Sequence, residues 1–203
     1  MLAEKQLLID YCPFEITPEQ INESIQNHNG KLIVSGLLQK ANERNFNGRI
    51  YPKKILMREA DKYLRTQIKE RRAIGELDHP ESQIINLNNV SHNILDLWWK
   101  DNDLYGKLEV LTTPSGNILR ELFKNGIKLG ISSRGLGSVK ELKEDNTVEV
   151  CDDFEIICFD MVSSPSTRGA FMYPLTEGIN KKNSVNNKWI NVERLITEIL
   201  MGA

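Results

Sequence analysis

A pair of strand-like segments joined by a tight turn constrains the fold of this chain most strongly. Residues 90–99 and 104–111 are rich in aliphatic and aromatic side chains, and the turn-forming run Lys100-Asp101-Asn102-Asp103 lies between them. Two strands this close in sequence pair as an antiparallel hairpin, because a parallel pair needs a crossover of a dozen or more residues. The segment therefore predicts an antiparallel sheet near the middle of the chain.

The other periodic segments extend this prediction to the whole fold. Helical spacing of apolar residues predicts helices over about 17–27, 53–70 and 114–124. Strands are expected at 31–38, 127–133 and 154–162, with a hairpin around 143–146. Gly36 in the first of these strands predicts a bulge or a close backbone approach. Because strands outnumber helices and most are joined by hairpins, we expect an α+β fold built on a mostly antiparallel sheet or barrel.

Composition limits the function classes. The chain has 203 residues, of which 40% are hydrophobic and 27% charged, as in ordinary globular domains. A net charge of -2 gives no basic surplus, so we expect no nucleic-acid partner. No apolar run approaches the roughly 20 residues that span a bilayer, and residues 1–5 do not resemble a secretory signal, so we expect no membrane association. Three cysteines without metal-type spacing are typical of a reducing compartment.

The residue composition of the chain changes near its C-terminal end. Residues 178–187 are rich in asparagine and lysine and contain few residues that could be buried, which is typical of a linker. Apolar residues at helical spacing follow, from Trp189 to Leu200. The sequence therefore predicts one domain over 1–177, a linker over 178–187 and an amphipathic helix over 188–203.

A glycine-rich serine segment is the first candidate for chemistry. Gly130 and Gly135 have the separation of a phosphate-binding loop, but Leu136-Gly137 follow where that loop needs Lys and Ser/Thr. A serine on a strand before such glycines could instead be a nucleophile beside backbone oxyanion donors. Ser132 and Ser133 point to opposite faces of a strand, so at most one of them is that nucleophile. Spacing alone equally describes a plain Ser-Gly turn with a structural Arg134.

A serine nucleophile needs a base, and the chain contains three histidines. His28 lies at the end of a predicted surface helix, and His92 lies in an alternating strand where it could be buried or exposed. His79 precedes Pro80, which favours an extended loop. No Cys/His spacing predicts a metal site. Taken singly, none of these residues is identified as catalytic.

Four segments taken together resemble a known family. They are Gly48-Arg-Ile-Tyr-Pro52, Gly75-Glu-Leu-Asp-His-Pro80, Trp98-Trp99-Lys100 with Tyr105-Gly106 beyond it, and Gly130-Ile-Ser-Ser-Arg-Gly-Leu-Gly-Ser138. They are similar to segments of the prohead core proteases of T4-like tailed bacteriophages, over about residues 37–174. The resemblance implies a herpesvirus-protease-like β-barrel ringed by helices and a serine endopeptidase that needs no cofactor and no metal.

The resemblance also implies roles for individual residues. Ser132 matches the nucleophile and His79 the general base, and backbone N–H groups around Ser133, Arg134 and Gly135 would hold the oxyanion. Asp160, in the strand before a Ser-Pro turn, fits best as the third residue. Glu76, three residues before His79, is the alternative.

For function, the resemblance implies cleavage of phage scaffold, core and capsid proteins inside the assembling prohead in the host cytoplasm. Cleavage would follow glutamate in (Leu/Ile)-x-Glu sites, and self-cleavage is expected after Glu177 or Glu198. A basic pocket would then be needed, and its candidates, which the sequence does not rank, are Arg49, Lys53, Arg134 and Arg168.

Other functions stay open at this stage. A noncatalytic capsid scaffold or interaction protein, with the terminal helix docked on a partner, is the main alternative. A cysteine protease that uses Cys158 with His79 is another, although Cys158 lies in an apolar run typical of a buried, inert thiol. The missing lysine argues against a nucleotide-binding module. Homo-oligomer formation is left undecided.

Overall fold

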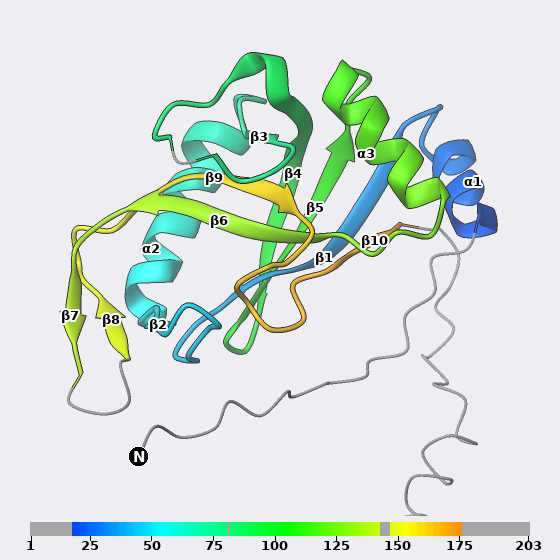
Figure 1. The fold of residues 1–203 in the computed structure, drawn as a ribbon. Helices are drawn as coiled ribbons and strands as arrows, with labels where there is room; N and C mark the ends of the chain where they lie inside the picture. Colours follow the sequence, from blue (N-terminus) through cyan, green and yellow to red (C-terminus); the bar gives the residue numbers. More distant parts are fainter. Residues whose placement is uncertain (1–17, 81, 143–146, 176–203) are drawn as a thin grey trace, which may run out of the picture.

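The computed structural model describes residues 18–80, 82–142 and 147–175 (Figure 1). The first residue of the helix predicted over 17–27 and the turn of the hairpin expected around 143–146 lie outside the described residues. So do the predicted linker, the C-terminal helix and the two self-cleavage positions, Glu177 and Glu198.

The predicted hairpin forms the centre of a five-stranded antiparallel sheet. Its strands lie in the order β10 (Met172–Pro174), β1 (Leu32–Lys40), β5 (Asp103–Val110), β4 (Val90–Lys100) and β3 (Ile74–Glu76). Asp101 in the turn adopts a positive φ of 53°, which short polar side chains tolerate. A Cβ on Gly36 would lie 2.0 Å from the Phe171 carbonyl oxygen, so the expected close approach is confirmed. The irregularity in β1 falls one position later, after Leu37.

A second pair of strands, β6 (Gly130–Leu136) and β9 (Glu155–Val162), runs antiparallel across the main sheet (Figure 1). The side chains of Ile131, Phe159 and Met161 pack with those of the main sheet in one core. A third, smaller sheet has the order β2 (Arg49–Ile50), β8 (Val148–Val150) and β7 (Val139–Glu141), and its β2–β8 pair is parallel.

The expected barrel is present only in part. Single bridges, Leu77 with Met161 and Gly130 with Phe171, connect the β6–β9 pair to the two edges of the main sheet. Both edge strands, β3 and β10, are only three residues long, and β3 leaves the sheet directly after Glu76. The described strands therefore form a mostly antiparallel α+β fold and no continuous closed barrel.

Among the described residues, three helices pack on the sheets at the positions predicted for them. They are α1 (Pro18–Asn27), α2 (Lys53–Tyr63) and α3 (Pro114–Lys124). A π-helical turn, η1 (Leu64–Ile68), continues α2, so the predicted helix over 53–70 has almost the expected length. The Thr113 hydroxyl caps α3 by accepting the Gly116 N–H at 3.1 Å. A short 3-10 turn, η2 (Leu87–Asn89), precedes β4. Within the described residues no helix is both long and apolar enough to cross a bilayer.

The boundaries of β6 differ from the prediction over 127–133. Pairing with β9 begins at Gly130 and continues to Leu136, with a register shift after Arg134. Gly135 allows this pairing to continue, because a Cβ there would lie 2.6 Å from the Phe154 ring. Ser132 therefore lies inside a strand, whereas the sequence pattern placed it near a strand end.

Candidate active site

His79 is held by the segment that leaves β3. After Glu76, the chain runs beside β9, and Asp78 N–H donates to the Met161 carbonyl at 2.9 Å. Asp78 adopts a φ of 72°, and its Oδ1 accepts the His79 N–H at 2.9 Å. Asp tolerates this left-handed conformation because its short carboxylate can bond locally. This turn directs the imidazole toward β9.

Asp160 of β9 receives that imidazole. His79 Nδ1 lies 2.9 Å from Asp160 Oδ2; the histidine side chain is 40% exposed and the carboxylate is fully buried. A carboxylate accepts, so Nδ1 carries the proton and Nε2 is the nitrogen left for another partner. Burial raises the pKa of Asp160, but bonds from His79 and the Glu76 N–H, together with the Arg134 charge, outweigh burial and hold that pKa below its usual value. The carboxylate therefore stays ionised near neutral pH.

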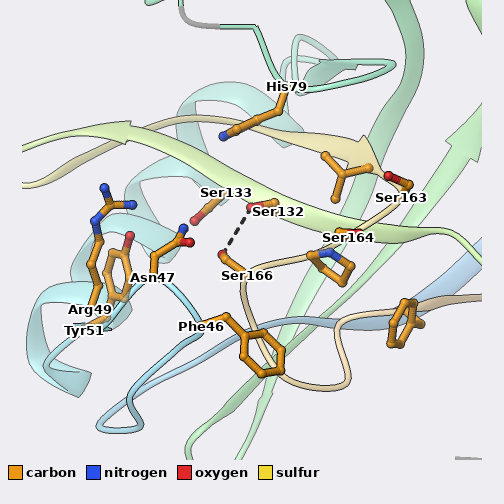
Figure 2. A pocket seen from close by; sticks show the side chains of 13 residues that line it. Phe46, Asn47, Arg49, Tyr51, His79, Ser132, Ser133, Ser163, Ser164 and Ser166 are labelled. Carbon is orange, nitrogen blue, oxygen red and sulfur yellow. Dashed lines mark hydrogen bonds between the residues drawn. The ribbon is translucent and has the colours of Figure 1, made fainter. Parts of the chain in front are cut away.

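Ser132 of β6 lies directly opposite Asp160 in the strand register. Opposed residues of an antiparallel pair project to the same face. Ser132 is 8% exposed, and its Oγ lies 3.4 Å from Ser166 Oγ. It shares a pocket of about 510 Å³ with His79, and Figure 2 shows Ser132 between His79 and Ser166. The three residues expected to form a triad thus lie near one another: His79 follows β3, Ser132 lies in β6 and Asp160 lies in β9.

The expected oxyanion residues differ in where their amides point. Ile131 N–H donates to the Ala170 carbonyl at 2.9 Å, so it points away from β9. Ladder bonds alternate along an antiparallel strand, which directs the Ser133 N–H away from β9 and the Arg134 N–H toward it. Ser133 lines the pocket of Ser132, whereas Gly135 lines an adjoining hollow of about 450 Å³ that also includes His79 and Ser133. Of these three residues, Ser133 offers an amide beside the nucleophile candidate.

Arg134 is buried in an ionic cluster and is therefore not an open basic site. It is 6% exposed, and Nη2 donates to Glu76 Oε1 at 2.7 Å and to Asp160 Oδ1 at 3.2 Å. Nε lies 3.0 Å from Asp160 Oδ2, but its N–H is not directed at a hydrogen-bond acceptor, so this contact is ionic. Its charge is therefore already paired, although Arg134 is among the residues that line the hollow of Gly135. Its place in the expected basic pocket stays a prediction. Arg49 lines both hollows, together with Tyr51.

Tyr51 explains part of the Gly48–Pro52 motif. Its ring packs edge-on against Phe154, with centroids 5.2 Å apart. Burial raises the pKa of its hydroxyl, and Arg49 and a hydrogen bond with Ser133 oppose this increase. The Tyr51 hydroxyl therefore stays protonated and hydrogen-bonds the Ser133 side chain, and both residues line the pocket of Ser132.

Two other candidates lie in the core. His92 is fully buried, and its Nε2 lies 3.0 Å from the Phe159 carbonyl, while Nδ1 lies 2.9 Å from Ser91 Oγ. Cys158 is also buried, and burial raises its thiol pKa to about 12, which opposes formation of a nucleophilic thiolate. No group of three or more metal-binding side chains occurs in the described part of the chain.

Sequence reasoning missed two partners of the site, Ser166 and the Glu76–Arg134 pair. Ser166 follows Pro165 in a serine-rich turn, which was a visible signal of a loop but not of a contact with Ser132. Glu76 and Arg134 are 58 positions apart, and nothing in their local patterns indicates that they pair.

A histidine oriented by a buried carboxylate and facing a pocket that contains a serine is the arrangement of a serine peptidase. The family model described as prohead core protein serine protease matches residues 4–180, so the chain belongs to that family, as the four motifs predicted. The chain is 32% identical over 186 residues to the prohead core protein protease of Enterobacteria phage T4, covering 85% of this chain and 86% of that protein. A solved structure of the bacteriophage T4 capsid assembly protease matches with a TM-score of 0.62 and 32% identity, over 65% of this chain and 81% of that one.

Proposed function

We propose that this chain is a serine endopeptidase in which Ser132 is the nucleophile, His79 the general base and Asp160 the residue that orients the histidine. The observation that carries the proposal is the 2.9 Å contact between the buried Asp160 and Nδ1 of His79, because His79 lines the pocket that contains Ser132. A serine hydroxyl is a weak nucleophile until a base accepts its proton.

The chemistry follows from these positions. Ser132 Oγ attacks the peptide carbonyl carbon while His79 Nε2 takes the hydroxyl proton, and the Ser133 N–H donates to the developing oxyanion. His79 then gives the proton to the leaving amine, and the C–N bond breaks. Water, activated by the same imidazole, hydrolyses the acyl-enzyme and restores Ser132. No cofactor is needed for these steps.

Ser132 must change its partner for this reaction. Its Oγ is 3.4 Å from Ser166 Oγ, a long contact for two hydroxyls. Bonds between nucleophile and base are often long in free enzymes and tighten when substrate binds. A rotation about the Ser132 Cα–Cβ bond, driven by a peptide in the pocket, would release Ser166 and direct Oγ to His79.

We further propose phage core, scaffold and capsid proteins as substrates, cut inside the assembling prohead in the host cytoplasm. The support is membership of the prohead core protease family and the names of its T4 relatives. Cleavage after glutamate fits Arg49, because its guanidinium lines both hollows beside Ser132 and can pair with a carboxylate. We also propose self-cleavage after Glu177 and Glu198.

Peptide cleavage by the full chain tests the proposal. Ser132→Ala should lower kcat/KM for a scaffold-derived Leu-x-Glu peptide by at least about 10³-fold. Ser138→Ala is the matched control, because this exposed serine follows the same strand and bonds Asp153 instead. Wild type should prefer Glu to Gln at the cleavage position, and Arg49→Gln should reduce that preference, whereas Lys54→Gln should not.

Labelling by a fluorophosphonate distinguishes the protease from a noncatalytic scaffold protein. Wild type should be labelled at Ser132, and Ser132→Ala should not be labelled. Equal peptide cleavage by wild type and Ser132→Ala would remove Ser132 from its proposed role, and the absence of labelling and cleavage in wild type would favour the noncatalytic alternative.

A further inference from the structure

One buried arginine joins the three segments that carry the proposed triad. Arg134 lies two residues after Ser132 on β6, and both side chains project from the same face of the strand. Its guanidinium contacts Asp160 of β9 through Nη2 and Nε. Its Nη1 donates to the Ser82 carbonyl at 2.8 Å, in the segment that follows His79.

The segment that carries His79 is held mainly by polar contacts, which include the Asp78 N–H bond to the Met161 carbonyl of β9 and the Leu77 N–H bond to the Asn89 carbonyl. Between β3 and η2 its described residues are mostly exposed, and Ile84 remains 79% exposed. Its two ends are tied to the same group, because Glu76 Oε1 accepts both Arg134 Nη2 at 2.7 Å and the Asn86 N–H at 3.1 Å. Among the contacts of this segment, the bond of Arg134 to the Ser82 carbonyl joins it directly to a side chain of β6.

The charges of the cluster also suit this role. Asp160 and Glu76 are fully buried, and Arg134 is the guanidinium that contacts both of them. Their charges sum to -1, which an imidazolium at His79 would bring to zero. A buried carboxylate without a cationic partner is strongly unfavourable, so the arginine permits two carboxylates to lie here. Arginine suits this position because its planar fork can bond several acceptors at once, which lysine cannot.

We propose that Arg134 is a positioning residue that clamps the His79 segment to the strands of Ser132 and Asp160, with Glu76 completing the clamp. This proposal rests on the proposed triad. Arg134 acts through Asp160 and the Ser82 carbonyl, to which its guanidinium is bound. Glu76, the alternative third triad residue, is assigned to the clamp.

Arg134→Lys keeps the positive charge but removes the planar guanidinium that bonds several acceptors at once. It should lower kcat on the order of 100-fold, the loss expected from a misplaced base, while KM for the same peptide changes by less than about threefold. Hydrogen exchange of the amides in residues 77–86 should become faster. Arg58→Lys is the matched control, because Arg58 also bonds two carboxylates and two carbonyls and does not line the pocket of Ser132. The kcat of this variant should stay unchanged.

A second variant distinguishes the effect of Arg134 on the position of His79 from its effect on the charge of the cluster. It combines Arg134→Met with Glu76→Gln, because Arg134→Met alone leaves two buried carboxylates without their arginine and can prevent folding. In Glu76→Gln/Arg134→Met, Asp160 alone keeps the cluster at -1. Thermal unfolding should show a folded chain, and kcat should stay low because the bonds to Ser82 and Asn86 are weakened or lost.

The outcomes distinguish this proposal from the proposed triad. If wild type is active and Ser132→Ala is not, a kcat for Arg134→Lys or for the double variant within about threefold of wild type overturns the clamp. If Ser132→Ala is as active as wild type, the triad itself fails. An increase in KM with unchanged kcat in Arg134→Lys would assign Arg134 to substrate binding and would also overturn the clamp.

Discussion

At the scale of single residues, two carboxylates near His79 have different partners for a simple geometric reason. Glu76 is three positions from His79, whereas Asp160 is 81 positions away and still contacts Nδ1. Glu76 is the last residue of β3, and its side chain enters the core toward Arg134 while its backbone N–H donates to Asp160 Oδ1 at 3.0 Å. The nearer carboxylate in sequence therefore supports the one that contacts the imidazole.

Burial of His92 makes the folding stability of the chain depend on pH. It is fully buried, and its Nε2 must carry the proton because the Phe159 carbonyl only accepts. Burial lowers the His92 pKa from 6.5 to about 4, against opposing contributions from Phe159 and Asp160. The unfolded chain takes up a proton near pH 6.5 and the folded chain does not, so stability is present above pH 6.5 and is lost as pH falls toward 4. The loss is up to about 3 kcal/mol.

His92→Gln should remove this dependence, because its amide can still donate to the Phe159 carbonyl but does not titrate. Urea unfolding at several values between pH 7 and pH 4 should show a shallower loss of stability than in wild type. Above pH 7 the two proteins should show the same slope. Equal slopes between pH 6.5 and pH 4 would contradict the assignment of His92 as a buried neutral group.

At the scale of elements, the contact between β3 and β9 determines where the segment that carries His79 leaves the sheet. A Cβ at Gly75 would lie 2.0 Å from the Phe159 carbonyl oxygen and 2.4 Å from His92 Nε2. Both neighbours are fixed, one by the backbone and the other by its two hydrogen bonds. β3 can therefore lie this close to β9 only with glycine at position 75.

Gly75→Ala should separate these strands. The expected cost in the free energy of unfolding is about 1–3 kcal/mol, and peptidase activity should fall further than stability alone explains, because Glu76 and His79 follow directly. Gly106→Ala is the matched control in the main sheet, where the added methyl meets the flexible Leu38 side chain. Urea unfolding and peptide cleavage measure both effects; an equal loss in the two variants would argue against a special role for the β3–β9 contact.

Local patterns predicted the elements far better than their assembly. The β4–β5 hairpin and α3 follow from alternation, turn residues and a cap that lie within a few positions of one another. The incomplete barrel depends on single bridges such as Leu77 with Met161, and the end of β6 depends on Phe154 packing against glycines. In the site, family motifs indicated Ser132, His79 and Asp160. The Arg134 cluster was missed because its partners meet only when β3, β6 and β9 are assembled.

At the scale of the whole molecule, the site lies where the β6–β9 pair meets the exit of β3, and the chain after β10 leaves from the opposite edge of the main sheet. Leu175, the last described residue, donates its N–H to the Ile33 carbonyl of β1 at 2.8 Å. The first residue of the Leu175-Thr176-Glu177 site is therefore paired with the sheet. Cleavage after Glu177 requires this residue to leave β1 and enter a pocket in an extended form.

This pairing predicts an order for self-cleavage. The Ile196-Thr197-Glu198 site begins 21 positions beyond Leu175, and its cleavage does not require that bond to break. Cleavage after Glu198 should therefore come first and remove five residues (203 − 198), as seen by intact mass. Cleavage after Glu177 should follow and remove a further 21 residues (198 − 177), whose four basic and two acidic side chains take the net charge from -2 to -4. Ion exchange would detect that change. Ser132→Ala should keep its full mass, whereas loss of the larger piece first would show that the Leu175 pairing does not protect its site.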